Sequence, residues 1–365
     1  FSARERITPP ISQKTDTKQD IKDVFKNIPW RAMFILTLFI FTTLAMWGSA
    51  MNYYFENYVD AGALYAFLDK IGLVATEAGD GIGYSILNAF GLIVSSPDKA
   101  YEVGFGVFNM LGALVQFFGV ILLSSFLANR YGKKRVFIIC LALTALFTAF
   151  FYFPNETDVE TMFVLNFLKS LAYAPTVPLL WAMIADVADH SEYVNHRRAT
   201  GFVFAGVVFA LKAGLGIGGA ILGFLLSGFG YVSGAGTEQT DSAIQGILLS
   251  SSLIPAATFF VGVIALYFYP ITKEYNERMQ AELKERVAQG RKKLADEMRL
   301  AMDAKQWVDA IQEYADITEL DAATLNRLIK EIVVHEHIDS DKTRHISIEI
   351  HFNLKPIPEV EQVKG

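Results

Sequence analysis

The chain has 365 residues, of which 52% are hydrophobic and 19% charged, and its formal net charge at pH 7 is −6. Such an apolar composition excludes an ordinary soluble globular protein unless apolar and charged residues are separated along the chain. They are separated, so the net charge averages unlike parts and indicates no particular partner. The single cysteine, Cys140, excludes a disulfide within the chain.

The first 31 residues are polar and hold seven Lys or Arg side chains. Because Lys and Arg mark the cytoplasmic side of membrane proteins, residues 1–31 are predicted to form a cytoplasmic N-terminal segment. No signal-peptide pattern precedes the first apolar run. The chain begins with Phe1 rather than Met, so we expect a fragment whose true start is missing.

Six long runs carry almost no charge, and each approaches or exceeds the ~20 residues needed to cross a bilayer. They lie at about residues 32–52, 104–128, 136–153, 161–185, 200–230 and 244–269. The loops after the second and fourth runs are basic, whereas the other connections hold only Lys70 and Lys99. This alternation predicts a six-span region, residues 32–269, with both chain ends in the cytoplasm.

The connection at residues 53–103 is predicted to be a long extracytoplasmic loop. Its apolar stretch from Gly81 to Ser95 is too short for a span and favours an amphipathic surface helix, with a re-entrant segment as the alternative. Just before it, the first run ends in amide and aromatic residues. These are either an interfacial aromatic belt or a wall facing a hydroxyl-rich ligand. They are Asn52, Tyr53, Tyr54 and Tyr58.

The fourth run contains Lys169 together with Pro175 and Pro178. Prolines break or kink helices, and broken helices at membrane depth are tolerated where they line a cavity. Lys169 lies about eight residues from the outer end of its run, and the pattern slightly favours a side chain that snorkels outward.

The fifth run contains Lys212 within a glycine-rich apolar stretch. A lysine at the bilayer centre costs ~2.5–3.5 kcal/mol on insertion scales, so it needs a partner or a wet cavity. A structural ion pair is one interpretation, and a charge in a coupling site is the favoured one. The neighbouring pairs Gly214/Gly218 and Gly219/Gly223 predict close helix packing.

The stretch from Trp181 to Gly219 resembles the glycoside–pentoside–hexuronide:cation symporters, the melibiose permease family of the major facilitator superfamily. The matching residues are an acidic run, a basic pair, a mid-span lysine and a glycine: Asp186, Asp189, Glu192, Tyr193, Arg197, Arg198, Lys212 and Gly214. The end of the first run at Tyr53 and Tyr54 also fits, as does the basic loop from Asn129 to Arg135.

The resemblance implies an all-α membrane protein with six transmembrane helices, one half of a 12-helix fold. It implies a bacterial inner-membrane transporter that performs no covalent chemistry and needs no cofactor or metal. Its ligands would be a sugar and a coupling cation, H⁺, Na⁺ or Li⁺. The lipid bilayer and the missing N-terminal half, which carries the family's cation-binding carboxylates, would be its other partners.

The resemblance also implies site residues. The coupling site and substrate cavity are expected at Lys212, Asn52, Tyr53, Tyr54, Lys169 and Trp181. A cytoplasmic gate of exchangeable ion pairs is expected at Asp186, Asp189, Glu192, Tyr193, Arg197, Arg198, Arg130, Lys133 and Lys134. A solvated charged loop is the alternative to the gate, because exposed ion pairs contribute little.

The last part of the chain is polar. Residues 270–305 are predicted to form a charged cytoplasmic helix, and residues 306–365 a small α+β tail resembling the C-terminal end of large serine recombinases. We expect a helix capped by Asp321, with Leu325, Leu328, Ile329 and Ile332 on one face, and then two strands. In the second strand Ile346, Ile348, Ile350 and Phe352 alternate, which predicts a half-buried strand.

The tail lacks the recombinase nucleophile and its arginines, so we predict no recombination chemistry. Its histidines favour a solvated hairpin face over a metal site. They are His335, His337, His345 and His351. The tail has no strong basic patch, which argues against nucleic-acid binding. Two alternatives to the transporter half remain open: a truncated or chimeric product without function, and a membrane-anchored protein that acts through its tail.

Overall fold

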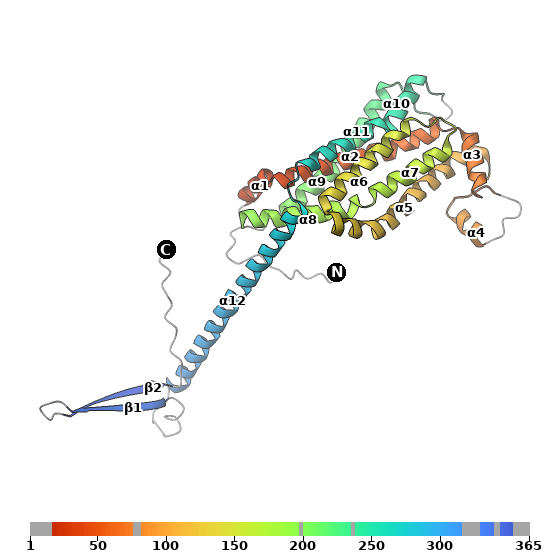
Figure 1. The fold of residues 1–365 in the computed structure, drawn as a ribbon. Helices are drawn as coiled ribbons and strands as arrows, with labels where there is room; N and C mark the ends of the chain where they lie inside the picture. Colours follow the sequence, from red (N-terminus) through yellow and green to blue (C-terminus); the bar gives the residue numbers. More distant parts are fainter. Residues whose placement is uncertain are drawn as a thin grey trace. The chain divides into compact units, whose positions relative to one another are not determined.

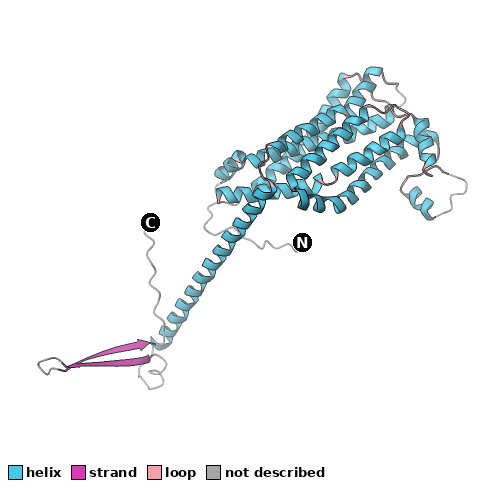
Figure 2. Ribbon diagram, viewed as in Figure 1, coloured by secondary structure: helices cyan, strands magenta, loops and turns pink. Residues whose placement is uncertain are grey.

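The computed structural model describes residues 17–75, 82–196, 200–234, 238–315, 329–338 and 344–352. The chain forms two compact units, Phe1–Ala281 and Glu282–Gly365. The described part of the first unit is helical, and the second unit contains the end of a long helix and two strands (Figure 2). The predicted fold class, an all-α bundle with a small tail that contains strands, is confirmed.

The described part of the chain holds six segments long and apolar enough to cross a membrane, as predicted. They are Ile28–Asn57, Ala100–Tyr131, Lys133–Tyr152, Val159–Asn195, Thr200–Gly228 and Asp241–Tyr267. The elements of this unit are α1 (Thr17–Lys26), α2 (Ile28–Asn57), α3 (Ala61–Lys70), α4 (Ile82–Ala89), η1 (Pro97–Lys99), α5 (Ala100–Tyr131), α6 (Lys133–Ala149), η2 (Phe150–Tyr152), α7 (Val159–Tyr173), α8 (Thr176–Asn195), α9 (Thr200–Gly228), α10 (Asp241–Ser251), α11 (Leu253–Tyr267) and the start of α12 (Lys273–Ala315) (Figure 1).

Helix α2 is fixed at its start by polar contacts that the sequence supplies locally. The Asn27 side chain accepts a hydrogen bond from the Trp30 backbone N–H at 3.2 Å, and Pro29 occupies the first turn, where its missing N–H costs nothing. The Trp30 indole N–H in turn donates to the Val203 carbonyl oxygen at 3.2 Å. These contacts set the register of α2 against α9.

Close packing of α2 against α9 depends on one of the two predicted glycine pairs. A Cβ at Gly214 would lie 2.5 Å from the Leu38 carbonyl oxygen, and one at Gly218 would also meet the α2 backbone. In contrast, nothing lies within 4 Å of a Cβ at Gly219 or Gly223. The prediction of close packing is therefore confirmed for the first pair only, and the second lies on the open face of α9.

The fourth span is broken, as its prolines predict. Helix α7 ends at Tyr173 and α8 begins at Thr176, with Pro175 in between. The Tyr173 carbonyl oxygen accepts a hydrogen bond from the Thr176 hydroxyl at 2.6 Å, which satisfies a backbone group near the interruption. The sixth span is also broken, at Ser252 between α10 and α11, and the sequence analysis did not predict this break.

The long connection contains two short helices, α3 and α4. Helix α4 has 8 residues, which confirms that this stretch is helical and too short to be a span. Helix α3 was not predicted; its N-cap is Asp60, whose carboxylate accepts from the Ala63 N–H at 2.7 Å. Lys70 at the end of α3 pairs with Glu160 on α7 at 2.6 Å, and both side chains are exposed.

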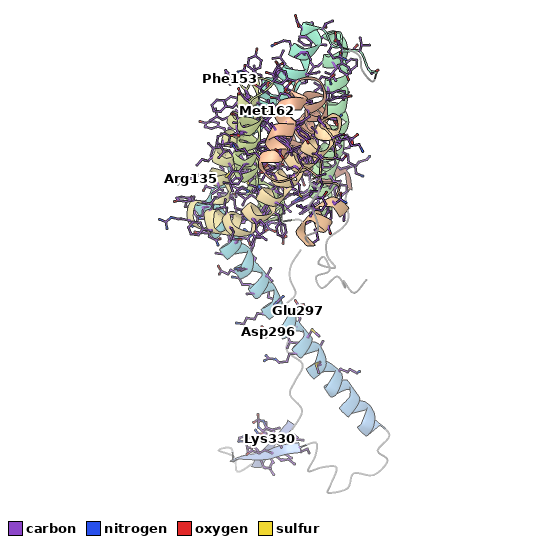
Figure 3. All side chains as sticks on the ribbon, turned by 90° about the vertical axis from the view of Figure 1, so that its right-hand side faces the viewer. Arg135, Phe153, Met162, Asp296, Glu297 and Lys330 are labelled. Carbon is purple, nitrogen blue, oxygen red and sulfur yellow. The ribbon has the colours of Figure 1, made fainter. Side chains whose placement is uncertain are left out.

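The bundle has two buried clusters of apolar residues. One surrounds Phe137 and Met183, and the other surrounds Phe108 and Phe151. The two ends of the bundle differ in charge: Arg135 lies at the end where α12 begins, and Phe153 lies towards the other end (Figure 3). We call the end with Lys133, Lys134 and Arg135 the basic end.

The outward side of α5 is strongly apolar. Exposed side chains on it include Phe117, Phe118, Ile121, Leu122 and Phe126. An apolar surface of this kind is typical of a helix that faces lipid or another membrane helix rather than water.

In the second unit, α12 continues to Ala315 and the strands β1 (Ile329–Ile338) and β2 (Arg344–Phe352) form an antiparallel pair. Ile329 and Ile332 were expected on a helix but lie in β1, because the β-branched run that follows them pairs with β2. The strand at Ile346 to Phe352 is confirmed. Its expected half-burial is wrong, since Ile346, Ile348 and Ile350 are 60%, 62% and 44% exposed. Asp321, Leu325 and Leu328 lie outside the described residues.

Candidate functional site

A cavity of about 220 Å³ lies inside the bundle, between α2, α5 and α7, with α6 and α11 behind it. The residues that line it are Leu44, Trp47, Phe108, Asn109, Gly112, Ala113, Gln116, Thr144, Asn166, Lys169, Ser170, Tyr173 and Phe259. They mix apolar, aromatic and amide side chains with one charged group. The volume is a little below the ~300–1,000 Å³ usual for small-molecule sites, which suits a small ligand or part of a larger one.

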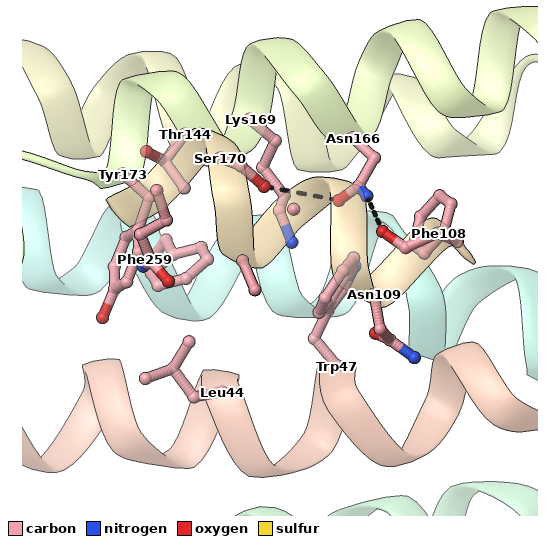
Figure 4. Close-up of a pocket in the computed structure, with 13 residues that line it drawn as sticks. Leu44, Trp47, Phe108, Asn109, Thr144, Asn166, Lys169, Ser170, Tyr173 and Phe259 are labelled. Carbon is pink, nitrogen blue, oxygen red and sulfur yellow. Dashed lines mark hydrogen bonds between the residues drawn. The ribbon is translucent and has the colours of Figure 1, made fainter. Parts of the chain in front are cut away.

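Lys169 is the only charged residue among those lining this cavity. Its side chain leaves α7 and crosses towards α2, where Trp47 points back at it (Figure 4). The Nζ atom lies 2.8 Å from the centroid of the Trp47 ring, well within the ~6 Å range of cation–π contacts. The outward snorkelling that the sequence favoured is therefore wrong. The amine lies inside the bundle instead, because the Trp47 ring faces it and the cavity gives its side chain room.

The cavity wall beside Lys169 contains polar side chains of α7, which fit there because α5 has a glycine opposite them. Asn166 donates to the Phe108 carbonyl oxygen at 2.7 Å, and the Ser170 hydroxyl lies 3.5 Å from the Asn166 side-chain oxygen. A Cβ at Gly112 would lie 3.1 Å from the Ser170 hydroxyl and 3.2 Å from the Asn166 amide. Gly112 thus allows α5 and the polar face of α7 to approach, which positions these groups at the cavity.

The other residues predicted for the cavity lie elsewhere. Asn52 accepts a hydrogen bond from the Tyr101 hydroxyl at 2.8 Å, and Tyr53 packs edge-on against Tyr231 at 5.1 Å between ring centroids. Tyr54 is fully buried in the aromatic cluster. Trp181 is 40% exposed on α8. The structure brings Lys169 into the cavity and leaves these four outside it.

Lys212 lies on the exposed side of α9, opposite the face that packs on α2. In the described part of the chain no carboxylate lies within ion-pair distance of it. Lys212 is also not among the described residues that line the Lys169 cavity. The predicted role of Lys212 in coupling stays a prediction.

At the basic end, several of the predicted gate residues form one network. The Lys133 amine lies 2.7 Å from both carboxylate oxygens of Asp186, which Asn276 at the start of α12 also contacts at 3.4 Å. Gln280 donates to Asp189 at 2.6 Å. A second cavity of about 290 Å³ opens beside the Lys133–Asp186 pair. Residues of α6, α8 and α12 meet here, although they are far apart in the sequence.

The remaining gate residues are placed more loosely or not described. Lys134 donates to the Tyr267 carbonyl oxygen at 3.2 Å and also to that of Tyr269. The Arg130 guanidinium lies 5.6 Å from the Tyr131 ring centroid, and Tyr193 packs edge-on against Tyr275 at 6.5 Å. Glu192 lies near the end of α8, and Arg197 and Arg198 lie outside the described residues.

Tyr269 connects the gate network to the core of the bundle. Its hydroxyl donates to the Met183 carbonyl oxygen at 3.3 Å. Burial raises the pKa of Tyr269 well above its ordinary value, and the negative charge of Asp186 raises it further. The phenol of Tyr269 therefore stays neutral and acts as a hydrogen-bond donor near the Lys133–Asp186 ion pair.

Sequence reasoning missed most of the cavity wall. Trp47, Asn109, Gln116 and Asn166 were not singled out, although two signals were available. Asn166, Lys169, Ser170 and Tyr173 recur at helical spacing, so they share one face of α7. Asn109 and Gln116 are seven residues apart, two turns along one face of α5. No metal-ligating cluster of three or more side chains occurs among the residues described.

Comparison with known proteins adds two family matches. The family model described as MFS/sugar transport protein matches residues 72–273. A domain of unknown function, DUF4368, matches residues 293–354. The second match does not test the resemblance of the tail to recombinases, which stays a prediction.

Curated relatives are similar over most of this chain. The inner membrane symporter YicJ of Escherichia coli K12 is 26% identical over 295 residues, 80% of this chain and 54% of the relative. The putative glycoside/cation symporter YagG of the same organism is 26% identical over 291 residues, with the same shares. The isoprimeverose transporter of Lactiplantibacillus pentosus is 25% identical over 289 residues, 79% of this chain and 51% of the relative. The chain spans about half the length of the curated relatives it matches.

Proposed function

Since this chain belongs to the MFS/sugar transport protein family, we propose that it forms one six-span half of a cation-coupled sugar symporter. It would work by alternating access, in which two six-span halves rock against each other around a site between them. The names of the relatives support this proposal, because they include a putative glycoside/cation symporter and an isoprimeverose transporter. The coupling cation would be H⁺, Na⁺ or Li⁺.

The observation that carries the proposal is the cavity around Lys169. Sugars are bound through hydroxyl groups, which need amide and hydroxyl partners, and through apolar ring faces. The cavity offers the side-chain amides of Asn109, Gln116 and Asn166 and the hydroxyl of Ser170. These groups come from α5 and α7, so a movement of either helix would change the affinity for sugar.

Lys212 supports the second part of the proposal, coupling to a cation. It is an exposed amine in the middle of a span, and it has no carboxylate partner among the described residues. We infer that carboxylates of a second six-span half face it in the working transporter. The Lys212 ammonium and the coupling cation would then compete for the same carboxylates. This competition would make the affinity for sugar depend on whether the cation is bound.

The network at the basic end would serve as a gate on the cytoplasmic side. This assignment rests on the positive residues of the loops, which mark that side, and it places both chain ends in the cytoplasm. The pair Lys133–Asp186 joins α6 to α8 and, through Asn276, to α12. Opening the cavity towards this end would separate these helices and break the pair.

The proposal is tested by uptake of a radiolabelled glycoside into proteoliposomes that contain this half together with its N-terminal six-span half. We expect uptake that depends on a cation gradient and that Lys212→Ala uncouples. Cation-coupled uptake at the wild-type rate in Lys212→Ala would contradict the coupling role. Absence of uptake with both halves present would support a product without function.

The role of the tail is tested with the same assembled halves, after this chain is truncated behind residue 305. We propose that the tail contributes nothing to the transport cycle, because the cavity and the gate network lie within the first unit. Unchanged uptake after truncation is the expected result. Loss of uptake would favour the alternative in which the protein acts through its tail.

A further inference from the structure

A third cavity, of about 290 Å³, lies between α1, the start of α2 and the end of α8, and we call it the α1–α8 cavity. No described residue lines both this cavity and either of the other two. Pro270 lines it, while the neighbouring Tyr269 and Ile271 line the cavity beside the Lys133–Asp186 pair. The α1–α8 cavity therefore lies at the basic end of the bundle, where the first span begins and the fourth span ends.

The α1–α8 cavity is rich in hydrogen-bond donors. Lys26, which is exposed, contributes an ammonium with three donors to its lining. The side-chain oxygen of Asn27 already accepts from the Trp30 backbone N–H, so the amide N–H groups of Asn27 are its main remaining capacity. The Nδ1 atom of His190 is buried and has no hydrogen-bond partner in the described part of the chain. Buried polar atoms without partners are rare, so this nitrogen indicates that a further group binds here.

The cavity has fewer acceptors than donors. Among the described residues that line it, Asp23 is the acidic one, and its Oδ1 atom already accepts from the Gln19 side chain at 2.7 Å. The Asn195 amide donates to the Ser191 hydroxyl at 3.4 Å, a long hydrogen bond that a stronger acceptor would replace. A ligand that suits this cavity therefore has several acceptor oxygens, together with hydroxyl groups that can donate to the carboxylate.

Exposed apolar side chains lead from the cavity along the first span. Ile28 lines the cavity and is 54% exposed, and Ile35, about two turns further along the same face of α2, is 43% exposed. Val194 of α8 also lines the cavity and is 54% exposed. Since α2 is long and apolar enough to cross a membrane, this face suits lipid acyl chains.

Helix α1 has the pattern of a helix that lies on a membrane surface. Lys18, Lys22 and Lys26 recur every four residues and form one exposed stripe, a spacing that the aspartates of α1 do not share. Ile21 and Phe25, which directly precede Lys22 and Lys26, are 41% and 60% exposed. A basic stripe beside exposed apolar side chains binds the boundary between anionic headgroups and acyl chains.

We propose that the α1–α8 cavity binds the headgroup of an anionic phospholipid of the phosphatidylglycerol type. The phosphate oxygens would accept hydrogen bonds from the Lys26 ammonium, the His190 Nδ1–H and the Asn195 amide. The hydroxyl groups of the glycerol headgroup would donate to Asp23, and the acyl chains would lie along Ile28 and the apolar face that follows it. This lipid site is independent of which solute the protein transports.

The test is lipid binding to the full chain in detergent, measured by native mass spectrometry. Phosphatidylglycerol, phosphatidylethanolamine and phosphatidylcholine with the same acyl chains are titrated in turn. We expect phosphatidylglycerol to bind at least about fivefold more tightly than the two lipids without net charge. A fivefold change corresponds to ~1 kcal/mol, the usual contribution of one Lys or Arg near an anionic lipid surface. Glycerophosphoglycerol, the same headgroup without acyl chains, should not displace the lipid.

Four variants locate the site. Lys26→Gln should remove the preference for phosphatidylglycerol, and Lys26→Arg should keep it. His190→Phe keeps a ring beside Tyr275, which lies 5.8 Å from His190 between ring centroids, but it removes the nitrogen and should weaken binding of phosphatidylglycerol about threefold. Lys22→Gln is the matched control and should change the affinity less than twofold. Lys22 is also exposed, one turn away on the same helix, and is not among the described residues that line the cavity.

The outcomes separate a lipid site from its alternatives. Equal affinity for the three lipids overturns the inference, and so does a preference for phosphatidylethanolamine, whose ammonium would pair with Asp23. Displacement by glycerophosphoglycerol would indicate a site for soluble phosphate esters and would overturn the lipid assignment. Equal losses in Lys26→Gln and Lys22→Gln would mean that the basic stripe attracts lipid without a site in the cavity. Because sugar uptake is not measured, failure of this inference leaves the proposed function standing.

Discussion

Two lysines near the middle of their spans, Lys169 and Lys212, have opposite surroundings. Lys169 lies in a cavity, and its amine is 2.8 Å from the centroid of the Trp47 ring. Lys212 lies on the exposed side of α9, and no carboxylate of the described chain pairs with it. The surroundings of Lys169 are provided by this chain, whereas no acidic partner for Lys212 occurs among the described residues.

The difference shows that a charge within a span has no single meaning. Both lysines are expensive at membrane depth for the same reason, the loss of hydration. The environment that offsets this cost can come from the same bundle, as the Trp47 ring of α2 does for Lys169 of α7. It can also come from a second half or from water, as the open face of α9 requires.

The largest effect is expected from a change that tests the two faces of α9 directly. In Gly218→Leu a side chain replaces the hydrogen that allows α2 to approach, and its Cβ would meet the Thr42 carbonyl oxygen. Overpacking against the backbone should destabilise the bundle by about 3 kcal/mol or more. Gly219→Leu is the matched control, because nothing lies within 4 Å of its Cβ. Thermal unfolding in detergent measures both, and equal loss of stability would refute the assignment of the two faces.

A smaller effect is expected where this chain supplies both members of an ion pair. In Lys133→Ala, Asp186 keeps a carboxylate whose side chain is only 10% exposed and loses its cation. Leaving a largely buried charge unpaired should cost about 2 kcal/mol of unfolding free energy. Lys70→Ala breaks an exposed pair, with side chains 68% and 64% exposed, and should cost less than ~1 kcal/mol.

Detergent unfolding of these two variants checks the ranking. Unfolding in 0.5 M salt adds a second readout, because salt screens exposed pairs more strongly than buried ones. Similar losses in Lys133→Ala and Lys70→Ala would mean that the Lys133–Asp186 pair is solvated, the charged-loop alternative at the basic end.

The sequence was sufficient to predict features that depend on local chemistry. The six spans follow from apolar length, and the break between α7 and α8 follows from Pro175. The basic end follows from a loop that holds Lys133 and Lys134. Each of these features is determined by residues that are close together in the sequence.

Several features that depend on distant residues were not predicted. Whether Lys169 turns inward depends on Trp47, a residue of another helix, and the sequence pattern of α7 alone fits both directions. The strand at Ile332 depends on its pairing with Ile350 of β2, which overrides its helical spacing. The break at Ser252 has no proline at the break itself, so a pattern search does not find it.

The smallest effect expected concerns the two lysines themselves. Lys169→Met removes an ammonium that has no acidic partner among the described residues lining its cavity, and it fills the same space with an apolar chain. We expect it to raise the unfolding free energy of this chain by about 1 kcal/mol. The variant no longer bears the free-energy cost of desolvating a buried ammonium, and this cost is larger than the stabilisation that the cation–π contact provides. Lys212→Met on the open face should change it by less than ~0.5 kcal/mol. Thermal unfolding in detergent compares the two variants.

A gain of stability confined to Lys169→Met would indicate that this amine is retained at a cost to the fold, which is common for residues that serve function. A loss of stability in that variant would mean that the Trp47 contact is structural, and the case for a ligand-binding amine would weaken. A gain in Lys212→Met as large as in Lys169→Met would remove the distinction between the two sites. The contrast therefore depends on one difference, a lysine enclosed by this chain against a lysine that faces out of it.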